Sequence, residues 1–212
     1  MRIVIAGGHG KIAQLLARQL AAAGHEPIGL IRNAKHADDL LAAGSTPVVL
    51  DLEQSTVQDV ADVLVGADAA VFAAGAGEGS GNDRKLSVDR DGAILLADAA
   101  LEAGVTRFIV ISSVGADSYD AASEDPFQVY LRAKGEADAA VRERDLDWTI
   151  VRPVTLTDEP GTGRISLGSH GGSIARADVA SVVVELLGGA GVRSVFEVSA
   201  GEQEVAEVLA AL

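Results

Sequence analysis

Tyr130 and Lys134 are the residues of this sequence whose types and spacing best suit acid–base chemistry. They lie four positions apart in the stretch YLRAK, so on a helix both side chains face the same way. An ammonium ion beside a phenol favours the ionised form of the phenol, and a phenol so placed can give or take a proton at a substrate oxygen. The alternative is an ordinary helix surface that carries a Tyr and a Lys.

A glycine-rich turn near the start of the chain offers a second kind of chemistry, the binding of phosphates. In IAGGHGKIAQLL the spacing is Gly7-x-x-Gly10-x-x-Ala13, between a predicted strand and a predicted helix. Gly7 permits the tight turn, Gly10 lets backbone N–H groups approach a pyrophosphate, and Ala13 lets the helix pack closely on the strand. This context predicts a dinucleotide site, although glycines also serve ordinary turns. We expect His9 to be a solvated loop residue rather than a substrate contact.

The end of the second predicted strand bears on which dinucleotide is bound. Chains that take NAD usually carry an acidic residue there, about 20 positions after the glycines, to hold the ribose 2′-hydroxyl. Here PIGLIRN ends in Arg32, with Lys35 nearby and no carboxylate before Asp38. A guanidinium suits a 2′-phosphate, so the sequence favours NADP over NAD, with a plain surface arginine as the alternative. Asp51, at the end of VVLD, is placed to accept from the adenine amino group or to cap the next helix.

The elements that must position these residues alternate along the chain. Helical apolar spacing in IAQLLARQLAAAG and GAILLADAALEAG ends at Gly24 and Gly104, as left-handed helix caps require. Apolar, β-branched runs recur at RIVIAG, EPIGLIR, TPVVLD, DAAVFAAG, RFIVISS and DWTIVRP. Continuous apolar strands joined by helices belong to a parallel sheet that is covered on both faces. The sequence therefore predicts an α/β fold, a doubly wound parallel sheet of the Rossmann type, as a single domain over residues 1–212.

Two irregular stretches, residues 75–84 and 157–173, interrupt this alternation as small insertions. Both follow predicted strands, so we expect them over the carboxyl edge of the sheet, where open α/β sheets bind ligands. Glu78, Asp83 and His170 lie in these stretches and are candidates for substrate selection, although solvated loops carry such residues routinely.

Composition limits the classes of function. The chain of 212 residues is long enough for one sizeable domain, and its net charge of −14 repels nucleic acid and anionic membrane surfaces. Cysteine is absent, which excludes disulfides and thiolate metal sites, and we expect no metal. The sequence shows neither a signal peptide nor an apolar run of about 18 residues. We therefore expect a soluble cytoplasmic protein, a monomer or homodimer, whose partner is a small-molecule substrate.

Several of these motifs together resemble the short-chain dehydrogenase/reductase superfamily. They are GGHGKIA, the arginine after the second strand, VDRDGAILLADAALEAGVTRFIVISSVGAD, YLRAKGEAD and LDWTIVRPVTLTDEPGTG. The likeness is greatest to the atypical NAD(P)-binding members called epimerase or NmrA-like, and it runs from residue 3 to about residue 187. It implies the fold and an NAD(P) cofactor. The reaction stays open, because the superfamily includes reductases, isomerases, flavin reductases and sensors without turnover.

The resemblance also assigns residues to the reaction. It implies that Ser113 orients the reacting oxygen, with Ser112 in a structural role, and that Lys134 holds the nicotinamide ribose. Asp89 stands where many members carry an Asn that holds a water of the proton relay. An Asp there can still hold Lys134, but its negative charge changes the surroundings of Tyr130.

The same resemblance supplies the rest of the cofactor site. It places the backbone of Pro153 and Val154 at the carboxamide edge of nicotinamide, although a proline can simply end a strand. Arg152 points the other way by alternation, so it either forms a structural ion pair or faces the substrate, and we favour the ion pair. Asp178 is expected to cap a helix or complement its dipole rather than to act in catalysis. The remaining cofactor residues that it implies are Lys11, Ile12, Leu52, Ala73, Ala74 and Gly75.

Two functions follow. The first is an NADP-dependent oxidoreductase for a small carbonyl or a quinone- or flavin-like compound, or an epimerase of the nucleotide-sugar type, that uses Tyr130, Lys134 and Ser113. The second is an NmrA-like regulator that binds NADP without turnover. An ordered Tyr/Lys/Ser set distinguishes them, because only the enzyme needs it.

Overall fold

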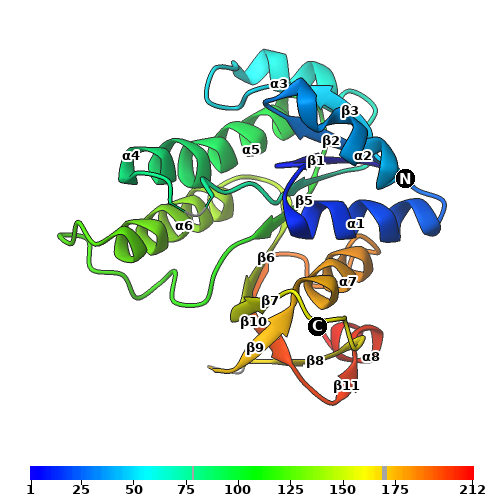
Figure 1. Ribbon diagram of the computed structural model, residues 1–212, viewed down its shortest axis with the longest axis vertical. Helices are drawn as coiled ribbons and strands as arrows, with labels where there is room; N and C mark the ends of the chain where they lie inside the picture. The colour runs from blue at the N-terminus through cyan, green and yellow to red at the C-terminus, as the bar shows by residue number, and fades with distance from the viewer. Residues whose placement is uncertain (78, 169–170) are drawn as a thin grey trace.

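The computed structural model describes residues 1–77, 79–168 and 171–212, and it shows a mostly parallel sheet with helices on both faces (Figure 1). Its parallel strands, in spatial order, are β3 (Thr46–Val49), β2 (Glu26–Ile31), β1 (Arg2–Ala6), β4 (Ala69–Phe72), β5 (Arg107–Ile111), β6 (Asp147–Pro153) and β10 (Ser194–Ala200). This order confirms the predicted single-domain, doubly wound sheet, and each of the six apolar runs forms one of its strands.

The helices bury the two faces of the sheet in separate cores. One face is covered by α1 (Lys11–Ala22), α7 (Arg176–Leu186) and α8 (Val205–Leu209), and the other by α3 (Val57–Leu64), α5 (Gly92–Glu102) and α6 (Pro126–Arg142). In β1, Ile3 and Ile5 face the first core and Val4 the second, so the strand is apolar throughout. Each such fully buried side chain stabilises the fold by about 1.5–3 kcal/mol relative to exposure.

Shorter helical segments lie in the connections. They are η1 (Ala34–His36), α2 (Ala37–Ala42), α4 (Asn82–Arg84) and a π-helical segment, η2 (Lys85–Asp91), that runs directly into α5. Gly24 and Gly104 have φ values of +79° and +73° just after α1 and α5, which confirms the predicted left-handed caps. Within the described part of the chain, no helix has the length and apolar character needed to cross a membrane.

The structure corrects the expectation of an irregular stretch at residues 157–173. That stretch contains β8 (Arg164–Leu167), which pairs antiparallel with β10, and β9 (Ser173–Ala175), which pairs with β7 (Thr155–Thr157). A short β11 (Gln203–Glu204) then pairs antiparallel with β8 at the edge of the sheet. Glu78 and His170, which we named as substrate-selecting candidates, lie outside the described residues.

The topology creates a crevice between β1 and β4. From β1 the chain winds outward through β2 and β3, and after α3 it returns to β4 on the opposite side of β1. The connections at the carboxyl ends of β1 and β4 therefore lead away in opposite directions. Open α/β sheets bind ligands at such a switch point.

Candidate functional site

The glycine turn between β1 and α1 forms the floor of the crevice. Gly7 has φ +80°, and a Cβ atom there would lie 2.5 Å from Cα of Ala74, so both backbone strain and packing require glycine. A Cβ at Gly10 would lie 3.1 Å from the carbonyl oxygen of Gly7 and 3.7 Å from that of Ala73, a tight fit that a small shift relieves. Gly10 thus keeps open a space beside the start of α1 that a side chain would fill, as a phosphate cradle requires.

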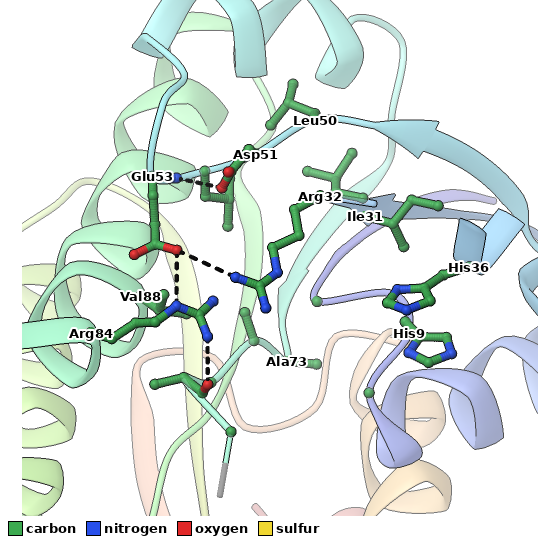
Figure 2. Close-up of a pocket in the computed structure, with 18 residues that line it drawn as sticks. His9, Ile31, Arg32, His36, Leu50, Asp51, Glu53, Ala73, Arg84 and Val88 are labelled. Carbon is green, nitrogen blue, oxygen red and sulfur yellow. Dashed lines mark hydrogen bonds and ion pairs between the residues drawn. The ribbon is translucent and has the colours of Figure 1, made fainter. Parts of the chain in front are cut away.

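A cavity of about 300 Å³ opens above this turn (Figure 2). Figure 2 shows the guanidinium groups of Arg32 and Arg84 converging on Glu53, with the stacked rings of His9 and His36 on another wall. The residues assigned to the cofactor that line this cavity are Gly7, Gly10, Arg32, Asp51, Leu52, Ala73, Ala74 and Gly75.

Charge in this first cavity is concentrated around Glu53. Its carboxylate accepts hydrogen bonds from Ser87 Oγ at 2.6 Å and Arg84 Nε at 3.2 Å, and Arg32 Nη1 lies 3.9 Å away. The Ser87 hydrogen bond lowers the pKa of Glu53, opposed by burial and assisted by Arg84 and Arg32. Arg84 also donates to the carbonyl oxygen of Ala76, while the side chain of Arg32 is 55% exposed and, among the described residues, makes only the long contact to Glu53. Arg32 is therefore the guanidinium better able to meet an anionic ligand.

Two polar residues of this cavity differ from their expected roles. Asp51 does not cap α3, because the N-cap is Thr56, whose hydroxyl accepts from the backbone N–H of Asp59; Asp51 instead accepts from Glu53 N at 3.1 Å. The contact of Asp51 with adenine stays a prediction. His9 is more than a solvated loop residue, because it lines the cavity, stacks on His36 at 3.7 Å and lies 2.9 Å from Asp39.

A second cavity, of about 340 Å³, shares the segment Ala73–Gly77 of its lining with the first cavity. The remaining residues that line it are Ile12, Ser80, Lys85, Asp89, Ile111, Ser112, Tyr130, Lys134 and Leu156. The structure therefore brings together Tyr130, Lys134 and Asp89, which the sequence analysis assigned to the reaction.

Lys134 is enclosed by protein acceptors in the wall of the second cavity. Its Nζ lies 3.1 Å from Asp89 Oδ1, 3.3 Å from the carbonyl oxygen of Ala74 and 3.4 Å from that of Ile111. The two carbonyl oxygens accept hydrogen bonds from the ammonium group, and Asp89 forms an ion pair with it. Burial alone would lower the pKa of Lys134, but the negative charge of Asp89, with Tyr130 and Asp138, outweighs it and raises that pKa. Lys134 is thus a fixed positive charge.

Tyr130 presents its hydroxyl group without a protein partner. Its ring centre lies 5.8 Å from Lys134 Nζ and 6.2 Å from the ring centre of Phe127. No hydrogen bond to the Tyr130 hydroxyl is formed by any residue that the structure describes. The phenol that is predicted to exchange a proton is therefore free to hydrogen-bond a ligand in the second cavity.

Asp89 connects Lys134 to the segment between the two cavities. Its Oδ2 accepts from the backbone N–H of Ala76 at 2.9 Å, and its side chain is 1% exposed. Asp89 lies in the π-helical segment η2, and such widened turns occur frequently at functional sites. The predicted pairing of Asp89 with Lys134 is therefore present in the structure.

Of the two serines after β5, Ser112 and not Ser113 reaches a cavity. Ser113 lines neither cavity, and its Oγ donates to the carbonyl oxygen of Val114 at 3.1 Å. Ser112 lines the second cavity, and its Oγ donates to Asp138 Oδ2 at 2.9 Å. Ser112 thus makes the structural hydrogen bond that we expected and also reaches the cavity. The catalytic role of Ser113 stays a prediction that this position does not favour.

Asp138 belongs to a buried network behind the second cavity. It accepts from Arg152 Nε at 3.0 Å and Nη2 at 2.8 Å, and Arg152 also pairs with Asp117. Burial raises the pKa of Asp138, and the charge and hydrogen bonds of Arg152, with Ser112 and Lys134, offset this only in part. Arg152 is therefore in the structural ion pair that the alternation of its strand predicts.

The other predicted residues lie around the two cavities. Lys11 forms an exposed ion pair with Asp158, and Ile12 lines the second cavity. Pro153 and Val154 line neither cavity; the backbone N–H of Val154 bonds to Val198 of β10.

Asp178 does not cap α7, whose N-cap is Ala175. It instead accepts from the backbone N–H groups of Thr162 at 2.9 Å and Gly163 at 2.8 Å. Its first-turn position is the one that suits the helix dipole.

Sequence reasoning missed three residues that shape the site. Glu53 and Arg84 carry no motif, although Arg84 lies at the end of a stretch that we expected near the ligand. Gly135 follows Lys134 in α6, where a Cβ atom would overlap the carbonyl oxygen of Ala116. A glycine inside an otherwise regular helix was the available signal for this close approach. Among the described residues, no group of three or more His, Cys, Asp or Glu side chains is arranged to hold a metal ion.

Comparison with known proteins gives consistent results. Residues 7–189 match a family described as NAD(P)H-binding. The uncharacterized sugar epimerase YhfK of Bacillus subtilis is 34% identical over 213 residues, 99% of each chain. Among solved structures, a candidate NAD-dependent epimerase/dehydratase of Bacillus halodurans is 35% identical, with a TM-score of 0.92 over 100% of both chains. The oxidoreductase ylbE of Lactococcus lactis is 29% identical, with a TM-score of 0.88 over 100% of this chain and 96% of the other.

Proposed function

Because this chain belongs to the NAD(P)H-binding family, we propose that it is an oxidoreductase that uses NADP(H) and acts on a small carbonyl compound or a quinone- or flavin-like compound. The observation that carries the proposal is the unpartnered hydroxyl of Tyr130, which lines a cavity beside the buried Lys134–Asp89 pair. Tyr130 is half-buried, and its hydroxyl has no hydrogen-bond partner among the described residues, so it can bond a ligand that enters the cavity. The name of the Lactococcus lactis relative as an oxidoreductase agrees with the proposal.

The first cavity fits an adenine dinucleotide. Gly7 and Gly10 leave the cradle open at the start of α1, where free N–H groups favour phosphate. Arg32 and Arg84 supply positive charge near the end of β2, and Glu53 is already engaged by Ser87 and Arg84. This arrangement supports NADP over NAD, because a guanidinium pairs with a 2′-phosphate through charge-assisted hydrogen bonds.

Residues of the second cavity then perform the proton chemistry. A bound nicotinamide dinucleotide would supply or accept the hydride ion, one proton with two electrons, that interconverts a carbonyl and an alcohol. Tyr130 donates its phenolic proton to the carbonyl oxygen in the direction of reduction and takes it back in the reverse direction. Lys134, fixed near the phenol ring, stabilises the negative charge left on Tyr130. Asp89 holds Lys134 in place, so it is a positioning residue.

The decisive experiment measures NADPH oxidation against quinones, aldehydes, ketones and flavins and then compares two tyrosine variants. On any active substrate, Tyr130→Phe should lower kcat by about a hundredfold or more, with little change in the affinity for NADPH. Tyr119→Phe is the matched control, since Tyr119 is the other tyrosine of the chain and lines neither cavity. Full activity of Tyr130→Phe would show that proximity alone drives the reaction, and the proposed role of Tyr130 would be abandoned.

The cofactor site has its own test. A valine at position 10 places a branched side chain in the cradle, so Gly10→Val should abolish NADPH binding in calorimetry while circular dichroism stays unchanged. Normal NADPH binding by a folded Gly10→Val protein would overturn the placement of the phosphates.

A second function, a regulator that binds NADP without turnover, is favoured by one observation. Lys134 Nζ already donates to the carbonyl oxygens of Ala74 and Ile111 and forms an ion pair with Asp89, so at most one of its N–H groups is left for a ribose hydroxyl. A sensor needs the first cavity and the cradle alone. Tight NADP binding with no oxidation of NADPH by any compound of the panel would establish this reading in place of the first.

A further inference from the structure

Lys85 is a lysine of the second cavity that the proposed reaction does not use. It is the first residue of the π-helical segment η2, it is half-buried, and it lines the cavity together with Tyr130. Its Nζ donates a hydrogen bond to the backbone carbonyl oxygen of Ser80 at 2.7 Å. That bond occupies one of its three N–H groups and leaves two available.

The charge of Lys85 has no counter-ion in the described part of the chain. Neighbouring cations of the same region are each paired: Arg84 with Glu53, Arg90 with Asp91 and Glu136, and Arg132 with Glu136. Residues 1–77, 79–168 and 171–212 place no carboxylate within ion-pair distance of Lys85. An unpaired cation is unexpected in a protein with a net charge of −14, where acidic partners are plentiful.

Among the described residues that line the second cavity, the balance of charge is consequently positive. Its lining carries Lys85, Lys134 and Asp89 as ionised groups, and Asp89 neutralises Lys134 at 3.1 Å. One positive charge, that of Lys85, remains in a partly enclosed space. The hydroxyl of Ser80 lies in the same wall, is itself buried, and has no hydrogen-bond partner among the described residues.

We propose that Lys85 determines specificity and that the second cavity takes an anionic carbonyl compound, with its carboxylate bound by Lys85 and its reacting oxygen at Tyr130. The inference rests on the proposed function, since it names the substrate class of the same site. A half-buried ammonium with two available N–H groups bonds more strongly to a carboxylate, which carries the opposite charge, than to the neutral oxygen of an ester. Desolvating Lys85 without an anion is unfavourable, so the cavity also selects against neutral compounds of the same shape.

The test uses carbonyl compounds with and without the negative charge of a carboxylate. Phenylglyoxylate, 4-carboxybenzaldehyde and levulinate are each compared with their methyl esters, by calorimetry on the NADP-loaded protein and by NADPH oxidation. We expect at least one acid to bind about tenfold to a hundredfold more tightly than its ester, the ratio that one hydrogen bond to a charged group supplies. Lys85→Met should lower the affinity for that acid to the level of the ester, and Lys85→Arg should retain most of it.

The control and the outcomes separate this inference from the proposed function. Arg142→Gln removes one positive charge from the exposed end of α6, away from both cavities, and should leave the ratio of acid to ester unchanged. Selective binding of an acid without NADPH oxidation keeps the inference and overturns the oxidoreductase. NADPH oxidation at equal rates with acids and esters keeps the oxidoreductase and overturns the inference about Lys85. Binding of no acid, or a ratio that Lys85→Met leaves unchanged, overturns the inference.

Discussion

Lys134 is an ammonium ion inside the protein, with 5% of its side chain exposed beside an Asp89 side chain that is 1% exposed. Such a pair is costly to form, because both ions lose their hydration, and it is far more costly to break by removing one partner. The surroundings of Lys134 favour its charged form, because Asp89 pairs with the ammonium group and the carbonyl oxygens of Ala74 and Ile111 accept hydrogen bonds from it. The pair is therefore a fixed feature of the folded chain, whatever ligand is bound.

The first prediction concerns the removal of this counter-ion. Asp89→Asn leaves the ammonium of Lys134 buried without a full negative charge, so we expect a loss of about 3–5 kcal/mol in the free energy of unfolding, measured with urea at neutral pH. Asp91→Asn is the control, because Asp91 is two residues further on and pairs with Arg90 at the surface. Asp91→Asn should lower the free energy of unfolding only slightly. Equal losses in the two variants would contradict the account of Lys134.

The second prediction is the pH dependence of the same pair. The pKa of Lys134 is raised in the folded state above the 10.5 of a free side chain, so its stabilising contribution is complete below pH 10.5. That contribution is lost as the pH rises through the folded-state pKa. We therefore expect the free energy of unfolding that wild type gains from the charged Lys134 to be constant from neutral pH to about pH 10 and to fall above it. In Asp89→Asn, burial acts on Lys134 without its counter-ion and favours the neutral amine, so the loss relative to wild type should be largest near neutral pH and should shrink as the pH rises. A loss that grows as the pH rises above neutral would assign the effect to another group.

The third prediction concerns the choice of dinucleotide. Arg32→Ala removes the exposed guanidinium near Glu53, so the affinity for NADP should fall by about 1.5–3 kcal/mol, while the affinity for NAD, which lacks the 2′-phosphate, should stay the same. Calorimetry measures the affinity of the Arg32→Ala protein for both dinucleotides, and the unchanged affinity for NAD is the control. If NADP and NAD lose affinity equally, Arg32 does not contact the 2′-phosphate.

Single residues also show what a sequence can predict of a site. Tyr130 and Lys134 were identified because residue type and helical spacing carry their chemistry, and Asp89 was identified through the family resemblance. The choice between Ser112 and Ser113 could not be made in this way, because a hydroxyl is directed by its partner, and the partner of Ser112 is Asp138, 26 residues further along the chain. Arg84 and Glu53 come together from positions 31 residues apart, and no local pattern records that distance.

At the scale of elements, the parallel strands were predictable and the edge of the sheet was not. Strands such as β1, β4 and β5 are buried on both faces and read as continuous apolar runs. By contrast, β8 has the sequence RISL, in which polar residues alternate with apolar ones over only four positions. The π-helical segment η2 has no sequence signature of its own, because its widened turn is imposed by the contacts of residues such as Asp89.

The fourth prediction tests the closest approach between two elements, α6 and the segment after β5. Gly135→Ala would force the carbonyl of Ala116 away from α6 and displace Tyr130 and Lys134, so we expect the stability to fall by about 1–3 kcal/mol, with weaker ligand binding. Gly92→Ala is the control in α5, since its Cβ would meet Leu52 and Phe72 at 3.6 Å, an ordinary contact. Helix propensity should make that variant neutral or more stable in urea unfolding. Similar losses in both variants would contradict the packing argument.

At the scale of the whole molecule, the fifth prediction follows from the net charge of −14. This field repels an anionic dinucleotide until it reaches Arg32, so screening should speed the approach. Raising the ionic strength from about 20 mM to about 200 mM shortens the Debye length from roughly 20 Å to roughly 7 Å. We expect the association rate constant of NADPH, measured by stopped-flow fluorescence, to increase across this range. A decrease would show that local positive charge governs the encounter.

The segment Ala73–Gly77 forms a wall of both cavities, and Asp89 holds it by the backbone N–H of Ala76. Ligands in the two cavities would both contact this segment, so the binding of one can change the affinity for the other. By thermodynamic reciprocity, a compound in the second cavity that tightens dinucleotide binding by some factor is itself bound more tightly by that same factor once the dinucleotide is present. The protein with bound dinucleotide would then prefer different compounds from the protein without it. The five residues of the segment would determine how strongly the two ligands affect each other's affinity.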